Sequence, residues 1–325
     1  MASGLVLIDK PEGWTSHDVV AKIRRLAGTR KVGHAGTLDP MATGLLILGV
    51  ESATKLLTFI VGDDKTYRTT IRLGAATITD DRESEVIEQA SPDQVLAIEL
   101  SQIKAEIQKL TGDIEQVPSS VSAIKVDGKR AYSMVRTGQE VVLKSRPVTV
   151  SRFELIGEPH IAVEGDQTYL DIDAEIDCSS GTYIRALARD LGRALGVGGH
   201  LTALRRTRIG DYSVDSAQSI AHLVRESEPE TLKLMPLADA AKEQFEARIL
   251  SDQDVIDLRH GKRLAHNNEG TEEFAGFDQG GNLIAILERS GSQVKSVVVF
   301  SEADSTKKQR SEEHTSELQS RLQIS

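Results

Sequence analysis

Hydrophobic residues near the N-terminus follow first strand spacing and then helical spacing. The apolar run Gly4 to Ile8 predicts a short strand that ends in a turn at residues 9–13. A helix should follow, capped by Thr15 or Ser16 and closed by Gly28. Its apolar positions recur three and four residues apart: Val19, Val20, Ile23 and Leu26.

The middle of the chain alternates between strand and helix patterns without a strict order. Tyr67 to Leu73 alternates as a strand does, with Tyr67, Thr69, Ile71 and Leu73 on one face. Apolar residues from Ser91 to Leu110 step by four and three, which predicts one helix that ends at Gly112. Helices that do not alternate strictly with strands favour an α+β fold with a largely antiparallel sheet. Further strands are expected at 45–48, 123–126, 148–155 and 169–176, and a further helix at 182–195.

Beyond about residue 240 the pattern changes to short strands separated by Gly-rich turns. A short helix at 249–258 precedes apolar runs at 274–277, 283–287 and 297–300. We therefore expect a large domain at 1–240, a small β-rich domain at 245–303 and a disordered tail at 304–325. Residues 310–320 read like the translation of a sequencing-adapter oligonucleotide, so residues 310–325 are left out of the fold prediction.

Composition excludes some classes of protein. The single cysteine, Cys178, excludes a disulfide framework and a Cys-rich zinc site. No apolar stretch approaches the roughly 20 residues needed to cross a bilayer, and the first ten residues lack a signal-peptide pattern. We therefore expect a cytoplasmic protein without membrane association.

The net charge of −10 argues against a nucleic-acid partner, but its distribution does not. Residues 116–152 carry seven Lys or Arg against two acids, and residues 181–210 carry six Arg against one acid. Residues 80–115 carry ten acids. A polyanion responds to the field at its contact face, so the basic segments can bind phosphate, although either segment alone is more often a solvated face.

The run from Gly33 to Gly44, GHAGTLDPMATG, concentrates reactive side chains in one glycine-rich loop. Its three glycines indicate a tight turn or a close approach of another chain segment. Asp39 before Pro40 has a structural interpretation, a helix N-cap with proline at the first helical position. The alternative is that Asp39, beside His34 and nearby basic residues, carries chemistry.

These residues resemble the TruB family of tRNA pseudouridine synthases. The resemblance covers roughly residues 4–212 and includes several long motifs in order, which makes chance a poor explanation. The motifs are GLVLIDKPEGWTSHD at 4–18, the run at 33–44, KTYR at 65–68, QVP at 116–118, SAIK at 122–125, GKRAY at 128–132, CSSGTYIRALARDLG at 178–192 and GHLTALRRTRIG at 199–210.

The resemblance implies a pseudouridine synthase fold, with a mixed, largely antiparallel sheet flanked by helices, and a small PUA-like C-terminal domain. It implies that Asp39 is the catalytic aspartate and that Tyr67 stacks on the target base. Arg185 would pair with Asp39, although Asp190 is a nearer acid in sequence, and Tyr67 could instead be a strand core residue. The resemblance also implies that His34 supports the flipped-out RNA and that Leu204 lines the uracil pocket. Further candidates for RNA contact are the basic residues Lys10, Lys125, Arg130, Arg205, Arg206 and Arg208. Lys125 and Arg130 could instead be solvated.

The chemistry implied is an isomerisation that needs no metal and no organic cofactor. Uracil leaves C1′ through N1, rotates and rejoins through C5, and a carboxylate can add covalently or remove a proton. A stacked base cannot be reached, so it must flip out at a cost of about a few kcal/mol. A stacking ring such as Tyr67 returns roughly 1–3 kcal/mol. An adduct at C1′, an adduct at C6 and a glycal route all remain open.

Two departures from the family pattern occur in this chain. Ser119 follows Pro118 where a second proline is common, and Ser84 stands at a usual glycine position after the run 77–81. We expect the 77–84 segment to form a peripheral loop.

The expected substrate is the uridine at position 55 in the T-loop of tRNA, bound by a monomeric enzyme that could also help tRNA to fold. One alternative is a synthase for ribosomal RNA or a guide-dependent one. The other is a catalytically silent RNA-binding or RNA-folding protein.

Overall fold

The computed structural model describes residues 3–119, 125–126, 129–130, 144–226, 232–265 and 271–301. Contacts divide the chain into two compact units. The first contains residues 1–39, 46–61 and 216–325, and the second contains residues 40–45 and 62–215. Asp39 therefore ends a segment of the first unit, and Pro40 begins a segment of the second.

In the first unit the strands pair in the order β15-β1-β3, with β2 beside β3 and β16 beside β1. Helix α1 begins after Thr15, whose side chain accepts a hydrogen bond from the Asp18 amide in a capping box, and Gly28 follows it with φ +61°. The strand and helix predicted here are confirmed. The elements are β1 (Gly4–Lys10), α1 (Ser16–Leu26), β2 (Val32–Ala35), β3 (Thr43–Val50), η1 (Glu51–Lys55), α2 (Leu57–Ile60), β15 (Gln218–Ser219), α7 (Ile220–Glu226), β16 (Met235–Pro236) and α8 (Leu237–Gln244).

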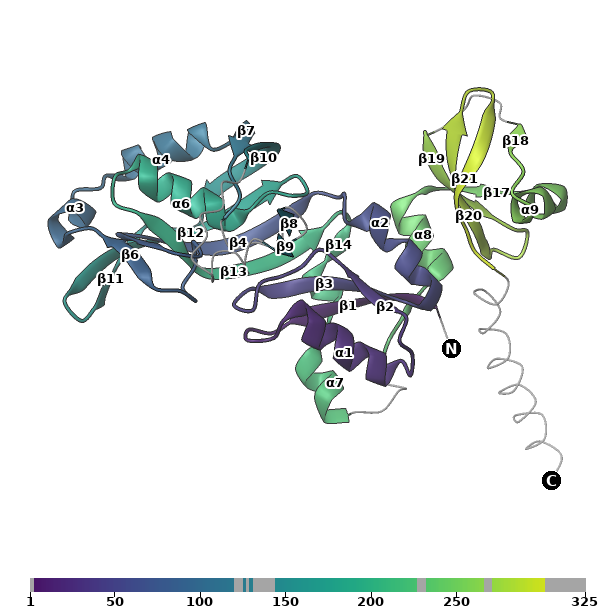
Figure 1. Ribbon diagram of the computed structural model, residues 1–325, viewed down its shortest axis with the longest axis horizontal. Coiled ribbons are helices and arrows are strands. Elements are labelled where there is room, and N and C mark those ends of the chain that lie inside the picture. Colours follow the sequence, from purple (N-terminus) through teal and green to yellow (C-terminus); the bar gives the residue numbers. More distant parts are fainter. Residues whose placement is uncertain are drawn as a thin grey trace. The chain divides into compact units, whose positions relative to one another are not determined.

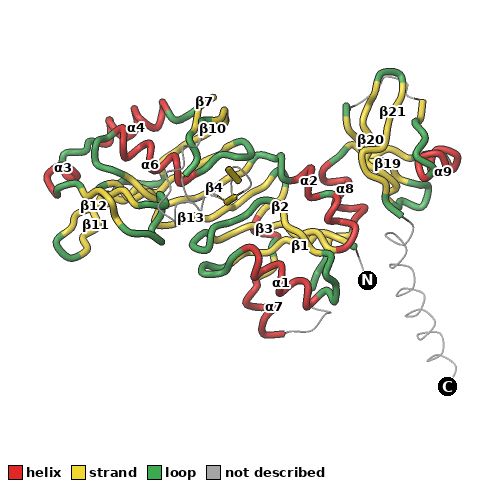
Figure 2. Tube along the Cα trace, in the orientation of Figure 1, coloured by secondary structure: helices red, strands yellow, loops and turns green. Residues whose placement is uncertain are grey.

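A five-stranded sheet in the order β17-β19-β20-β21-β18 occupies the C-terminal part of the first unit. Figure 2 shows this segment as mostly strand with one short helix, α9. Its core is apolar and includes Leu258, Phe274 and Leu287. The β-rich pattern predicted for this region is confirmed. The elements are β17 (Glu246–Ile249), α9 (Asp252–Arg259), β18 (Leu264–Ala265), β19 (Glu273–Phe277), β20 (Leu283–Ser290) and β21 (Gln293–Val299).

The second unit is built on the strand order β13-β4-β12-β10-β7, in which each neighbouring pair is antiparallel. Helix α6 packs against β13 and β4, and α4 packs against α6 (Figure 1). The long strands are β4 (Lys65–Leu73), β10 (Arg146–Leu155), β12 (Gln167–Cys178) and β13 (Gly199–Ile209). The remaining elements are β5 (Ala75–Thr77), β6 (Val86–Gln89), α3 (Pro92–Leu96), α4 (Leu100–Lys109), β7 (Gly112–Gln116), β8 (Lys125–Val126), β9 (Lys129–Arg130), β11 (His160–Glu164), α6 (Ile184–Ala194), β14 (Tyr212–Ser213) and η2 (Val214–Ser216).

Alternation along β4 assigns one face of this sheet to the core. Tyr67, Thr69, Ile71 and Leu73 are all buried, as the alternation predicts. The single helix predicted from Ser91 to Leu110 is wrong, because α3 and α4 are separate helices. Each begins with its own capping box, at Ser91 and at Glu99, and a new cap interrupts the earlier helix.

Candidate active site

Asp39 lies in the loop that leads from β2 into β3. Residues 36–42 contain no helix, so the interpretation of Asp39 as a helix cap is wrong. Gly36 has φ +78°, a conformation that favours glycine, and this turns the chain back toward β3. Asp39 is half-buried, between buried Leu38 and exposed Pro40. A carboxylate that is partly exposed can reach a substrate and is therefore suited to act as the reacting group.

The Gly33–Pro40 run is not a loop throughout. Gly33, His34 and Ala35 belong to β2, and His34 pairs with Leu48 of β3. The His34 side chain is partly exposed. The glycines predicted a close approach of another chain segment, and this occurs at Gly44. A Cβ there would lie 2.2 Å from the carbonyl oxygen of Arg206.

Lys10, which the sequence suggested for RNA contact, is fully buried at the end of β1. Its Nζ donates to the carbonyl oxygens of Pro11 at 3.0 Å and Trp14 at 2.6 Å. These bonds hold the turn that leads into α1. An ammonium buried in this way braces the fold and does not face phosphate, so the RNA contact predicted for Lys10 does not fit the structure.

Two of the predicted site residues lie side by side on β4 and β13. Tyr67 is paired with Arg206 and Thr69 with Leu204, and opposite residues of an antiparallel pair point to the same face. Tyr67 and Leu204 are each 7% exposed. The second unit therefore places a ring and an apolar side chain together on the face covered by α6.

Arg206 shares that face but is only 1% exposed, and its Nε donates to the Leu45 carbonyl oxygen at 2.8 Å. This hydrogen bond links β13 to Leu45 of β3. The phosphate contact predicted for Arg206 does not fit, because a fully buried guanidinium offers no surface to RNA.

Arg185 lies near the start of α6 and is 5% exposed. Its NH1 donates to the Thr79 carbonyl oxygen at 2.8 Å and lies 3.4 Å from the Asp81 carboxylate. Asp190, the nearer acid in sequence, instead pairs with Arg189 at 2.9 Å. The alternative partner for Arg185 is therefore wrong, because Asp190 is bound by Arg189, which lies on the same helix.

The 77–84 segment, expected to be peripheral, supports Arg185. Asp80 and Asp81 are 7% and 3% exposed, and burial raises the pKa of the Asp80 carboxyl despite the Ser119 hydroxyl and Arg189. The Ser84 hydroxyl accepts a hydrogen bond from the Thr79 amide at 2.9 Å. Ser84 thus binds Thr79, the residue whose carbonyl oxygen accepts a hydrogen bond from Arg185. The sequence predicted a peripheral loop here, whereas Asp80 and Asp81 are buried.

Arg205 and Arg208 lie on the other face of the sheet from Tyr67. Arg205 is paired with Arg68 and Arg208 with Thr66, the two neighbours of Tyr67 on β4. Side chains of successive strand residues point to opposite faces. Arg205 and Arg208 therefore point away from the face that carries Tyr67, and the phosphate contacts predicted for them stay predictions.

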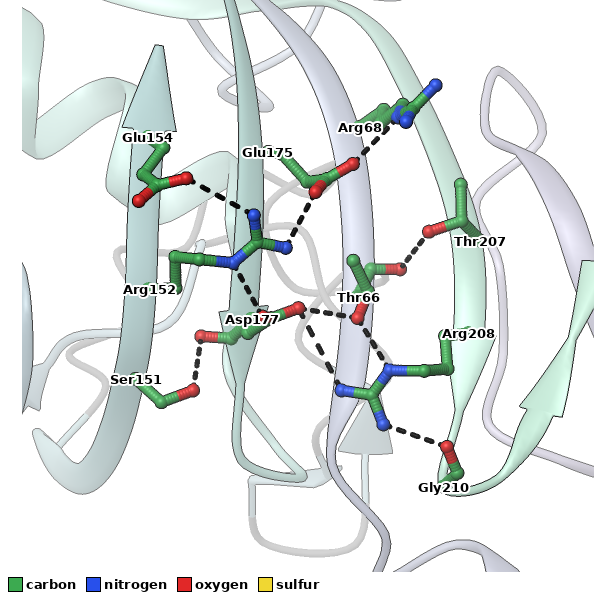
Figure 3. Close-up of polar contacts among 10 residues, drawn as sticks. All are labelled: Thr66, Arg68, Ser151, Arg152, Glu154, Glu175, Asp177, Thr207, Arg208 and Gly210. Atoms are coloured by element: carbon green, nitrogen blue, oxygen red, sulfur yellow. Dashed lines mark hydrogen bonds and ion pairs between the residues drawn. The ribbon is translucent and has the colours of Figure 1, made fainter. Parts of the chain in front are cut away.

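A network of ion pairs covers this outer face (Figure 3). Arg152 binds Asp177 at 2.7 Å and Glu175 at 2.6 Å, and Arg68 binds Glu175 at 2.8 Å. Arg208 donates to the Thr66 hydroxyl at 2.8 Å and lies 3.8 Å from Asp177. Hydrogen bonds from Arg68 and Arg152 lower the pKa of the Glu175 carboxyl. The network ties four strands together and leaves acids beside every arginine, a poor surface for a polyanion.

Two predicted RNA-binding residues, Lys125 and Arg130, belong to β8 and β9, and their side chains lie outside the described residues. Within the described ranges, no group of three His, Cys, Asp or Glu side chains is arranged to hold a metal ion. No helix among those ranges is long and apolar enough to cross a membrane.

Family models match the chain in three consecutive segments. Residues 24–184 match the TruB family pseudouridylate synthase N-terminal domain. Residues 185–237 match the tRNA pseudouridylate synthase B C-terminal domain, and residues 245–301 match the tRNA pseudouridine synthase II C-terminal model. A protein of Leifsonia xyli named tRNA pseudouridine synthase B is 55% identical over 303 residues, which are 92% of this chain and 97% of that protein. The chain belongs to the TruB family.

Other TruB relatives are similarly close. The protein named tRNA pseudouridine synthase B from Mycobacteroides abscessus is 51% identical over 304 residues, 93% of this chain and 97% of its own length. A chain in the crystal structure of a Cbf5-Nop10-Gar1 complex aligns with a TM-score of 0.65 and 23% identity over 92% of this chain and 84% of that one. A chain from an H/ACA RNP bound to a substrate RNA gives 0.63. These two alignments show that the TruB chain shares its fold with the aligned chains.

Proposed function

We propose that this chain is a tRNA pseudouridine synthase that isomerises the T-loop uridine at position 55. One observation carries the proposal: relatives named tRNA pseudouridine synthase B match nearly the whole chain at about half identity. The motif residues that the resemblance assigns to chemistry are present at Asp39, Tyr67 and Arg185. The substrate would be the T-stem-loop.

Asp39 is the proposed catalytic carboxylate. The bond from C1′ to N1 breaks, the uracil turns within the site, and a bond from C1′ to C5 forms. The proton on C5 is then lost and N1 gains one, so the isomerisation consumes no oxidant, reductant or transferred group. A carboxylate can serve by adding to the substrate or by removing a proton, and its half-buried loop position suits either role.

Tyr67 and Leu204 would form the pocket for the flipped base. Their place on adjacent strands of one face supports this role, because a ring and an apolar side chain there could enclose uracil. His34 would stabilise the flipped-out RNA. Arg185 would orient the catalytic carboxylate, and its bonds to Thr79 and Asp81 would fix the guanidinium from behind.

The RNA phosphates would be bound by Lys125 and Arg130 in the basic segment 116–152. We leave Lys10 and Arg206 out of this set because both are buried, and Arg205 and Arg208 because they lie on the outer face. The catalytic domain would span residues 1–240, and a PUA-like domain at 245–303 would add RNA contacts. We propose a monomer that acts in the cytoplasm, where tRNA is modified.

A synthase that acts on a different RNA is the nearest alternative, and a catalytically silent RNA-folding protein is the more distant one. Folding activity could also accompany catalysis. Pseudouridine mapping after incubation with total RNA distinguishes a tRNA substrate from ribosomal RNA. Formation of pseudouridine in a T-stem-loop excludes the silent protein.

The decisive experiment compares the parent chain with Asp39→Asn on a T-stem-loop RNA. Asp93→Asn is the matched control, since it makes the same carboxylate-to-amide change at an exposed position of α3. We expect pseudouridine from the parent and the control and none from Asp39→Asn, with RNA affinity unchanged. Product formation by Asp39→Asn at the parent rate would exclude Asp39 as the reacting group. The stereochemistry of a 5-fluorouridine product would then separate the adduct and glycal routes.

A further inference from the structure

The first turn of α1 contacts the loop that carries Asp39. This turn is fixed by its own capping box, in which Thr15 Oγ1 accepts from the Asp18 amide at 3.1 Å and Asp18 Oδ2 accepts from the Thr15 amide at 2.8 Å. The box satisfies backbone donors at the helix end without help from the loop. The end of the helix therefore does not depend on bonds from the loop.

Ser16, the first residue of α1, holds the residue immediately before Asp39. Its side chain is buried, and its hydroxyl donates to the Leu38 carbonyl oxygen at 3.1 Å and accepts from the Leu38 amide at 2.9 Å. One hydroxyl can do both because it carries one donor and two acceptor sites. Leu38 itself is 4% exposed, so its backbone groups have no access to bulk water. Without the hydroxyl, both polar groups of Leu38 would be buried without this partner.

The same helix turn also contacts β2, the strand that leads into the loop. The His17 ring lies edge-on to the His34 ring, with 6.1 Å between centroids and 75° between planes. Gly36, with φ +78°, falls between the two contacts. In the sequence, Gly36 thus lies between His34 and Leu38. These two residues are contacted by His17 and Ser16, which are adjacent in one helix turn.

We propose that Ser16 is a positioning residue for Asp39, and that His17 supports it by holding His34 in β2, just before that loop. The inference rests on the proposed function in which Asp39 reacts. The two bonds to Leu38 set the orientation of the peptide that precedes Asp39, and hence the direction of its carboxylate. A displacement of about 1 Å in a reacting group can cost on the order of 100-fold in rate, so a hydroxyl that never touches RNA can control catalysis.

The test compares three variants of the full chain on the T-stem-loop RNA. Ser16→Ala removes both bonds, Ser16→Thr keeps the hydroxyl, and Thr15→Ala weakens the same helix end without touching Leu38. Three quantities are measured: the single-turnover rate, the dissociation constant for RNA, and hydrogen exchange at the Leu38 amide. A role in general stability alone would affect Thr15→Ala and Ser16→Ala alike.

We expect Ser16→Ala to slow the single-turnover step by about 10- to 100-fold. RNA affinity should stay within twofold of the parent and exchange at Leu38 should be faster. Ser16→Thr should recover most of the rate, and Thr15→Ala should react at the parent rate. The inference is overturned if Ser16→Ala reacts as fast as the parent, or if Thr15→Ala is slowed by the same factor.

Failure of the proposed function gives a different result from failure of this inference. If the parent makes no pseudouridine, the function is wrong, and the Leu38 exchange rate still tests the anchor. Unchanged exchange in Ser16→Ala would then refute the anchor independently of activity. If the parent is active but Ser16→Ala matches it in both rate and exchange, only the positioning role of Ser16 is lost.

Discussion

One added methyl group at Gly44 should destabilise the second unit strongly. Gly44 has φ +98°, and a Cβ at this site would lie 2.2 Å from the Arg206 carbonyl oxygen and 2.9 Å from the Arg206 backbone nitrogen. Gly44 is also the Cα partner of Arg206 in the pairing of β3 with β13. The obstruction is backbone on a central strand, which cannot rotate away as a side chain can.

The expected cost of Gly44→Ala has two parts. The left-handed backbone conformation costs roughly 1–2 kcal/mol for a residue with a Cβ. Forcing atoms into a filled space costs typically about 1–3 kcal/mol. We therefore expect Gly44→Ala to lower the free energy of unfolding by about 2–5 kcal/mol.

Gly157→Ala supplies the matched control for the backbone part. Gly157 has φ +74° and no atom within 4 Å of its would-be Cβ, so only the conformational cost of roughly 1–2 kcal/mol applies. Urea unfolding followed by circular dichroism measures both variants against the parent. The reasoning is refuted if the two variants unfold at the same urea concentration, since the close approach of Arg206 would then cost nothing.

Four further predictions concern individual side chains. Asp81→Asn should lower the single-turnover rate roughly tenfold or more, because breaking a buried ion pair costs about 3–5 kcal/mol and this pair holds Arg185. An unchanged rate would contradict the role of the 77–84 segment. Burial lowers the pKa of His200, so its contribution to stability is present above about pH 6.5 and is lost as the pH falls toward its folded pKa. His200→Gln should therefore lose less stability than the parent between pH 7.5 and 5.5, measured by urea midpoints at each pH. Burial raises the pKa of Cys178 to about 11, so iodoacetamide at pH 8 should label it only after unfolding, as mass spectrometry would show. Arg208→Gln should leave RNA affinity and its salt dependence unchanged, and a weaker salt dependence would place RNA on the outer face.

The segment at 77–84 illustrates why the contacts of Arg185 were hard to predict from the sequence. Its threonines, aspartates and Ser84 have the composition of an exposed loop. Its burial depends on α6, which lies about a hundred residues further along the chain. Polar composition describes a segment alone, whereas burial depends on what packs against it, so no local pattern could reveal that Thr79 and Asp81 bind Arg185.

Local spacing by itself determined the first strand and helix, the buried face of β4 and the place of Asp39 in a glycine-rich turn, because a strand or helix repeats its pattern over neighbouring residues. Only the tertiary structure decided which way the arginines of β13 point. Simple alternation would place Arg206 and Arg208 on one face, but the register shifts between them, so that Arg206 faces Tyr67 and Arg208 faces Thr66. One extra residue in a strand reverses the faces of all that follow, and that shift is fixed by the partner strand. The same holds for Ser16, whose partner Leu38 lies 22 residues away and is brought to it by the fold.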